Sequence, residues 1–258
     1  MLDYFRRKRW RRLRSAPFPD EWDALLRRRV YLYEALPAHL RRELQGWIQI
    51  FLADKIFEGC NGFIVTDEVR VIIAAQASLL LLNRDVGCYP KLYTILVYPN
   101  EFVAPIQEHR DHIVTEDRRA RSGEAWSRGT VILSWEDIEI GLDDSESYNV
   151  VVHEFAHYFD EETGEANGAP FLDDRSEYEE WARVFQEAYR RHRRESRLGY
   201  PTVLDPYGAD DPAEFFAVAT EAFFESPRDL KRDYPDLYGQ LRRYYQQDPV
   251  EYYRQPEE

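Results

Sequence analysis

The 258-residue chain has few cysteines, no long apolar run and no export signal that can be recognised. Two cysteines, Cys60 and Cys88, are too few for a disulfide framework, so free thiols in a reducing cytoplasm are expected. The longest apolar stretch, residues 71–82, covers about a dozen positions, whereas a membrane span needs about 20. Residues 15–20 (SAPFPD) stand where a secretory signal would place its apolar core. These absences favour a cytoplasmic protein without a transmembrane segment.

Positive charge is also scarce, because 34 Lys and Arg face 48 Asp and Glu, giving a net charge of −14. This acidic composition argues against general nucleic-acid binding, because a domain that binds nucleic acid normally has a basic face. The exception is a basic N-terminal arm, residues 1–19, which holds seven Lys and Arg between positions 6 and 14. We expect this arm to be flexible or to dock on the acidic body rather than to bind a membrane, a nucleic acid or another protein.

The rest of the chain, residues 20–258, is predicted to form a single domain because no repeat and no Pro-rich or Gly/Ser-rich linker divides it. The order of elements, helices, then a small sheet, then helices, indicates an α+β fold with helices packed on that sheet. Apolar periodicity, β-formers and caps predict the elements. The predicted helices are residues 20–42, 44–56 (ending near Gly59), a buried one at 71–82, 150–161, 176–194 and 211–224, and the predicted strands are 63–66, 92–98 and 130–135.

The strongest signal for chemistry lies in residues 148–160, YNVVVHEFAHYFD. His153, Glu154 and His157 form an H-E-x-x-H motif, and Asn149 is placed to cap the helix predicted here. Residues four apart share one helix face, so both imidazoles can reach one metal ion. Glu154 then lies close enough to a metal-bound water to take its proton. The pattern indicates a zinc site with a general base.

A plainer interpretation makes His153 and His157 ordinary histidines, paired with neighbouring acids such as Asp160 or Glu161. Most flanking side chains are apolar, so the helix should be buried, and buried imidazoles need partners for their ring nitrogens. One zinc ion per chain is the more economical partner.

Catalytic zinc normally takes three protein ligands, so a third is expected downstream. A third histidine in the pattern H-E-x-x-H-x-x-G-x-x-H would need Gly at 160 and His at 163, where the chain has Asp160 and Thr163. The only later histidine, His192, lies among four arginines, whose charge would repel a cation. The third ligand is therefore expected to be a carboxylate.

Glu214 is the preferred carboxylate, in the segment DPAEFFA at residues 211–217. The spacing leaves an alternative open, because Asp211 and Glu214 also match a capping box in which Glu214 turns back to the cap amide. Glu221, seven residues on and on the same helix face, is the second candidate. Further candidates rank below it: Asp160, Asp173, Asp174 and Glu177.

Several stretches together resemble the Mlc titration factor A family of zinc metallopeptidases, and the likeness covers nearly the whole chain after the basic arm. These stretches are EGCNGFIVTDEVRVIIAAQASLLLL (58–82), VILSWEDI (131–138), YNVVVHEFAHYFD (148–160), EANGAP (165–170) and YGADDPAEFFAVATEAFF (207–224).

The resemblance implies zinc bound by His153, His157 and Glu214, the gluzincin set of H-E-x-x-H with a distant glutamate. It implies Tyr207 as a second catalytic side chain beside Glu154; without the resemblance, a turn residue between Pro206 and Gly208 is the alternative interpretation. It also implies a zincin-like α+β domain related to the catalytic domain of anthrax lethal factor. Further implications are an aminopeptidase-like activity on short substrates and a role in binding a transcriptional repressor resembling Mlc.

Two classes of function follow from these features. The first is a zinc peptidase that hydrolyses peptide or protein substrates, with Glu154 as general base. The second is a protein-binding regulator with a structural or latent zinc site; Glu154 favours the peptidase, because a structural site has no use for a base. The strand at 130–135 is either an edge that pairs with substrate or an ordinary interior strand.

Overall fold

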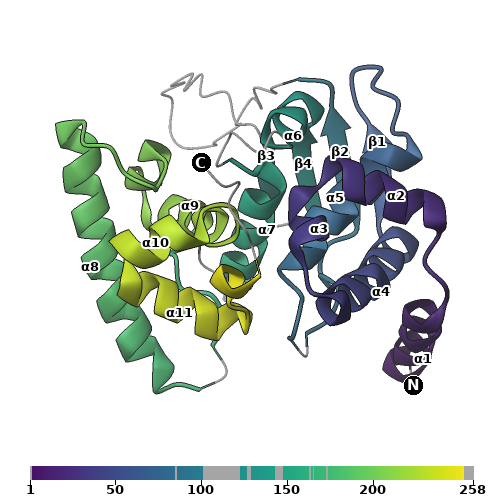
Figure 1. Ribbon diagram of the computed structural model, residues 1–258, viewed down its shortest axis with the longest axis horizontal. Helices are drawn as coiled ribbons and strands as arrows, with labels where there is room; N and C mark the ends of the chain where they lie inside the picture. The colour runs from purple at the N-terminus through teal and green to yellow at the C-terminus, as the bar shows by residue number, and fades with distance from the viewer. Residues whose placement is uncertain are drawn as a thin grey trace, which may run out of the picture.

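The computed structural model describes residues 2–84, 86–100, 123–126, 129–142, 148–162, 164, 166–172 and 174–252. These residues form helices and one small sheet, joined by turns and loops (Figure 1). In chain order the elements are α1 (Leu2–Ser15), α2 (Asp20–Arg29), α3 (Tyr31–Ala35), α4 (Ala38–Asp54), β1 (Ile56–Gly59), α5 (Asp67–Leu79), β2 (Thr94–Tyr98), β3 (Gly123–Trp126), β4 (Thr130–Ser134), α6 (Trp135–Gly141), α7 (Val150–Glu161), α8 (Glu177–Leu198), the 3₁₀ turn η1 (Pro206–Ala209), α9 (Pro212–Glu225), α10 (Pro227–Asp233), α11 (Pro235–Tyr245) and the 3₁₀ turn η2 (Pro249–Glu251).

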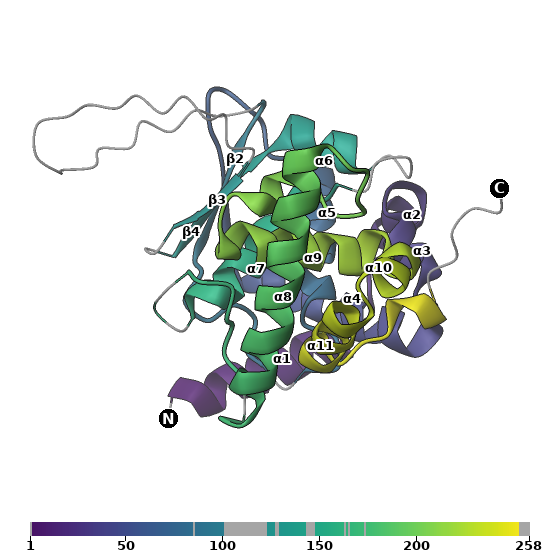
Figure 2. The ribbon, with the colours of Figure 1, turned by 90° about the vertical axis from the view of Figure 1, so that its left-hand side faces the viewer.

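The sheet is mixed, with the strand order β1-β2-β4-β3. β1, β2 and β4 are parallel, and β3 runs antiparallel along β4. Figure 2 shows the sheet at the left, with α7 and α9 to its right. The predicted α+β class is confirmed, since the helices gather beside one small sheet.

The strand β4 lies inside the sheet, between β2 and β3. Val131 and Leu133 are almost fully buried, as are Ile95 and Val97 on β2. Of the two alternatives for residues 130–135, the ordinary interior strand is therefore confirmed and the substrate edge is excluded. Among the strands that the structure describes, the edge strand on this side is β3, which also contacts α7.

The predicted helix over residues 44–56 ends too late. α4 stops at Asp54, and Lys55 is extended, with φ −103° and ψ 145°. The Lys55 ammonium group is buried and donates to the carbonyl oxygens of Cys88, Tyr89 and Leu92 at 2.7–2.8 Å. The chain is thereby held beside the segment that leads into β2, and β1 pairs with that strand.

The predicted strand at residues 63–66 is also wrong, because these residues have no regular structure. The preceding turn contains Asn61 and Gly62, both with positive φ, which carries the chain away from the sheet. Thr66 nevertheless caps α5, since its side chain accepts a hydrogen bond from the amide of Val69.

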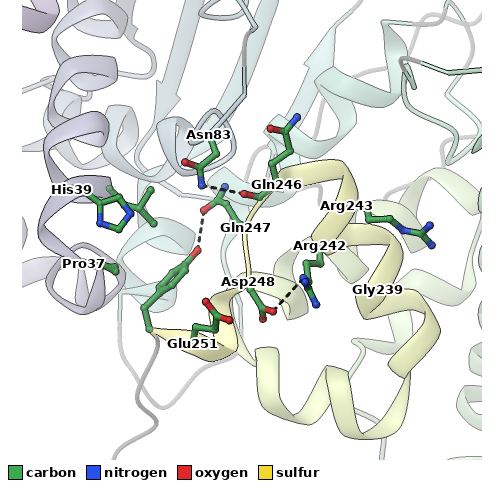
Figure 3. A pocket seen from close by; sticks show the side chains of 12 residues that line it. Pro37, His39, Asn83, Gly239, Arg242, Arg243, Gln246, Gln247, Asp248 and Glu251 are labelled. Carbon is green, nitrogen blue, oxygen red and sulfur yellow. Dashed lines mark hydrogen bonds and ion pairs between the residues drawn. The ribbon is translucent and has the colours of Figure 1, made fainter.

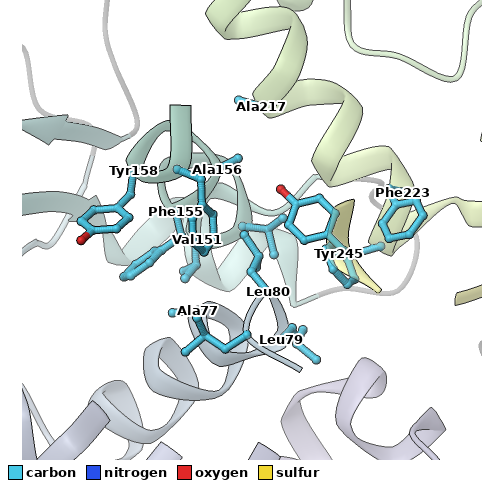
Figure 4. Packing of buried hydrophobic residues seen from close by; sticks show 14 of the residues in the cluster. Ala77, Leu79, Leu80, Val151, Phe155, Ala156, Tyr158, Ala217, Phe223 and Tyr245 are labelled. Atoms are coloured by element: carbon cyan, nitrogen blue, oxygen red, sulfur yellow. The ribbon is translucent and has the colours of Figure 1, made fainter. Parts of the chain in front are cut away.

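Helix α7 lies in the middle of the molecule, between α5 and α9 (Figure 1). Its apolar side chains, among them Phe155, fill the space between α5 on one side and α9 and α11 on the other (Figure 4). The ring of Phe155 lies 4.6 Å from that of Tyr89 and 5.8 Å from that of Phe51, between ring centroids. Packing on both sides fixes the helix that carries the H-E-x-x-H motif.

The basic arm contains α1, which docks on α4 through one face. Trp10 packs edge-on against Trp47 at 6.3 Å and donates to the carboxylate of Asp54 at 2.6 Å. Arg9 reaches the other oxygen of Asp54 at 2.7 Å.

Cys60 and Cys88 are free thiols, as expected. None of the described helices is both long enough and apolar enough to cross a bilayer.

Candidate metal centre

The two histidines project from one face of α7. Asn149 caps this helix as predicted, because its side-chain oxygen accepts from the amide of Val152 at 3.0 Å. With the helix fixed from its first turn, His153 and His157 stand one turn apart, and their Nε2 atoms are 3.1 Å from each other. His153 is 7% exposed and His157 is partly buried, so the two ring nitrogens converge below the protein surface.

The third group comes from the first turn of α9, which lies alongside α7. Asp211 caps α9 by accepting from the amides of Ala213 and Glu214 at 2.8 and 3.0 Å. The side chain of Glu214 does not fold back to complete a capping box. Its Oε2 instead lies 3.1 Å from Nε2 of His153 and 3.3 Å from Nε2 of His157.

These three groups match the ligand set that zinc prefers. One ligand atom from each of His153, His157 and Glu214 lies within 4.8 Å of the others. In a tetrahedral site with bonds of about 2.0–2.1 Å, neighbouring ligand atoms are about 3.3 Å apart. The observed separations of 3.1, 3.1 and 3.3 Å are close to that edge length. A small divalent cation therefore fits among the three atoms.

The electrostatics of the cluster suit a cation. Burial opposes ionisation of Glu214, but hydrogen bonds from His153 and His157 outweigh it and hold the pKa of Glu214 well below its usual range. Burial also opposes a charge on His153, yet the carboxylates of Glu221 and Glu214 raise its pKa. Because a metal binds neutral imidazole, metal binding here would release a proton.

The other predicted carboxylates lie outside the three-residue cluster. Glu221 contacts the far side of the His153 ring, at Nδ1. Asp160 accepts from the amide of Gly168 and so holds the loop after α7. Asp174 accepts from the amide of Ser176, and Glu177 begins α8. Asp173 lies outside the described residues.

His192 is also not part of the cluster, as the sequence predicted. Its ring is buried, and Nε2 donates to the carbonyl oxygen of Asp205 at 3.0 Å. Asp205 precedes η1, and its side chain accepts from the amide of Tyr207 at 2.8 Å. His192 thus holds the turn that carries Tyr207.

The two predicted catalytic side chains lie beside the cluster. Glu154 is buried on α7, next to His153. Tyr207 is 38% exposed, its hydroxyl group donates to Oε1 of Glu214 at 3.1 Å, and its ring centroid lies 6.1 Å from that of His153. One side of the cluster is thus closed by protein and the side near Tyr207 is open to solvent.

The sequence interpretation missed Glu225 and Asp205. Glu225 accepts from the side-chain amide of Asn149 at 2.7 Å, and a signal for it existed, since it follows Glu221 by four residues on the same face of α9. Asp205 was recognisable from the order Asp-Pro-Tyr, in which an aspartate side chain can bind the backbone two residues on.

The sequence profile of the family described as "Glucose-regulated metallo-peptidase M90" matches residues 4–246. The chain belongs to this family. The M90 match includes every residue of the cluster and both helices that carry it. The expected metallopeptidase family is thereby confirmed.

Three curated relatives are similar to this M90 chain over most of its length. An uncharacterised protein of Synechocystis sp. is 43% identical over 93% of the chain and 90% of its own length. Mlc titration factor A of Pectobacterium atrosepticum is 31% identical over 90% of the chain and 87% of its own length. The protein of that name in Escherichia coli O7:K1 is 32% identical over 86% of the chain and 84% of its own length.

A separate hollow of about 890 Å³ lies where the start of α4 meets α11 and residues 246–252 (Figure 3). Arg242 on its wall pairs with Asp248 at 3.2 Å, and Arg243 pairs with Glu180 at 3.0 Å. Its lining includes no residue of the metal cluster. Since both arginines already have carboxylate partners, we assign no ligand to this hollow.

Proposed function

We propose that this M90 protein is a zinc-dependent peptidase whose metal is held by His153, His157 and Glu214. The observation that carries the proposal is the convergence of two imidazole nitrogens and one carboxylate oxygen at separations of 3.1–3.3 Å. A zinc ion bound there supplies a Lewis acid, which lowers the pKa of water and polarises a carbonyl group.

Glu154 acts as the general base in this proposal. Its position next to His153 on α7 supports the role, because the carboxylate lies beside the proposed metal and the residue is 3% exposed, which shields it from bulk solvent. Glu154 takes a proton from the attacking water and passes it to the leaving amine.

Tyr207 acts as a hydrogen-bond donor to the oxyanion of the tetrahedral intermediate. Its hydroxyl group already lies at the open side of the cluster, 3.1 Å from Glu214. The turn that carries it is fixed by Asp205 and His192, so the donor is held in place before substrate arrives.

The substrate is an extended peptide that pairs with the edge strand β3. The position of β3 supports this choice, because it is the outermost of the described strands on this side and contacts α7. Strand addition depends on main-chain hydrogen bonds, so peptides with N-methylated amides should bind more weakly than their unmethylated counterparts. Equal binding of both would exclude strand pairing.

The finer assignments belong to the same proposal. They are an aminopeptidase-like preference for short substrates, a zincin-like relation to the catalytic domain of anthrax lethal factor, and a repressor partner. The partner is supported only by the printed name of the relatives, Mlc titration factor A. That name also supports the second candidate, a protein-binding regulator with a latent zinc site.

The deciding experiment measures zinc content and hydrolysis of free and N-blocked chromogenic peptides, for the wild type and Glu154→Gln. One zinc per chain in both proteins, with hydrolysis only by the wild type, would establish the peptidase. Cleavage limited to unblocked substrates would establish the aminopeptidase preference. Zinc without hydrolysis in either protein favours the regulator, and a wild type without zinc would overturn the proposal.

A further inference from the structure

We propose that Glu221 is a positioning residue for zinc binding, which sets the ring orientation and tautomer of His153 and ties that ring to the first turn of α7. The inference rests on the proposed zinc site and adds to it a residue that touches neither metal nor substrate.

The contacts of Glu221 carry the argument. The residue is 5% exposed, and both carboxylate oxygens contact α7 or its cap. Oε1 lies 2.6 Å from Nδ1 of His153, and Oε2 accepts from the backbone amide of Asn149 at 2.9 Å. One carboxylate on α9 therefore binds both the cap of α7 and the first histidine.

Glu225 completes this contact one turn later. Its Oε1 accepts from Nδ2 of Asn149 at 2.7 Å, while Oδ1 of Asn149 accepts from the amide of Val152. Glu225 also receives a hydrogen bond from the hydroxyl group of Tyr31 on α3. The backbone amide and side chain of the cap are thus both held by carboxylates of α9.

This arrangement determines which nitrogen of His153 faces the metal position. An ionised carboxylate only accepts hydrogen bonds, so Nδ1 must carry a proton. Nε2, which points at Glu214 and His157, is then the nitrogen that gives up its proton and offers its lone pair when a metal binds. Partners of this kind fix the ligand ring and raise its basicity, and their loss typically lowers metal affinity by about 10–100-fold.

A glutamine cannot replace Glu221 fully. Its single oxygen can accept either from His153 or from the amide of Asn149, and its NH₂ group, a donor only, would face the other proton. Glu221→Asp keeps the charge but shortens the side chain by one methylene group. Both variants should therefore loosen the ring of His153 while leaving all three ligands present.

The test measures the zinc dissociation constant by competition with a chromophoric chelator at fixed pH. We expect Glu221→Gln and Glu221→Asp to bind zinc about 10–100-fold more weakly than the wild type. The matched control is Glu187→Gln, the same change at a carboxylate on α8 that is 75% exposed, and it should bind like the wild type. Circular dichroism identifies any variant that fails to fold, and Glu221→Asp then stands in for Glu221→Gln.

A second measurement needs no variant. In zinc-loaded wild type, long-range ¹H–¹⁵N spectra should show His153 protonated at Nδ1 and metal-bound through Nε2. Unchanged zinc affinity in folded variants, or a proton on Nε2, would overturn the role of Glu221 alone. A wild type that binds no zinc would overturn the proposed function and this inference together, whereas a wild type that binds zinc without hydrolysis leaves the affinity comparison decisive.

Discussion

The hydroxyl group of Tyr207 donates a hydrogen bond to Oε1 of Glu214, while Oε2 of the same carboxylate faces His153 and His157. Residues 207–214 include most of the turn η1 and the cap of α9. The open side of the cluster and its third ligand candidate are therefore built from one short segment.

Tyr207→Phe should retain one zinc per chain and lose turnover. The phenyl ring keeps its packing but has no donor for the oxyanion, and loss of one such donor lowers kcat by about 10²–10³-fold elsewhere. The measurement is kcat and KM on a chromogenic peptide, with zinc content determined on the same sample. An unchanged kcat would return Tyr207 to a role in the turn.

Glu154→Gln should keep the fold and the zinc but hydrolyse peptides at least about 10²-fold more slowly, because an amide cannot take the proton from water. Steady-state assays with metal analysis test this. A suitable control is Glu187→Gln, which removes a carboxylate from an exposed position on α8. Comparable activity of Glu154→Gln and the wild type would disprove the assignment.

Removing the metal should lower thermal stability without unfolding the protein. Glu214 and both histidines contact one another directly in the structure, so the cluster remains hydrogen-bonded without a cation. Adding zinc at about 100 times its dissociation constant should contribute about 2.7 kcal/mol to the free energy of unfolding. Calorimetry with and without a chelator measures the shift, and a Tm insensitive to both zinc and chelator would contradict a zinc site.

Acidification should destabilise the protein partly through His192. Burial lowers the pKa of His192 below its ordinary value of 6.5, because a charged imidazole is poorly solvated there. Nδ1, which would carry the added proton, has no hydrogen-bond partner within the described structure. The unfolded chain therefore binds a proton that the folded protein refuses, and stability falls as the pH drops below about 6.5.

Urea unfolding at pH 7.5 and 5.5 tests this point. The wild type should lose more free energy of unfolding than His192→Gln, whose amide can still donate to Asp205 but does not titrate. Equal losses in the two proteins would show that His192 does not contribute to the pH dependence.

The sequence predicted the helices of the metal centre because their signals are local. Asn149 before an apolar run, and Asp211 followed by Pro212, mark the starts of α7 and α9 within one turn. The wrongly predicted element boundaries lie where contacts between residues far apart in the sequence determine the structure. Ile56 continues the helical stripe of α4, yet it belongs to β1 because it lies opposite Thr94, 38 positions later.

The choice of the third metal ligand among the carboxylates was limited in the same way, because it also depends on contacts between distant residues. Glu214 and Glu221 lie on one face of α9, and spacing could not tell which approaches Nε2 of His153 and which approaches Nδ1. The answer depends on how α9 lies along α7, which brings Glu214 to one side of the ring and Glu221 to the other. Such a relation exists only in the packed molecule.

The 22-residue helix α8 separates the two helices that carry the candidate metal centre, so the three candidate ligands are not synthesised together. A ribosome-bound chain that has just produced α7 carries both histidines but neither Glu214 nor Glu221. The centre can therefore close only after α8 and α9 have left the ribosome. Nascent fragments that end before α9 would lack the third candidate ligand and would hold zinc too weakly to act as peptidases.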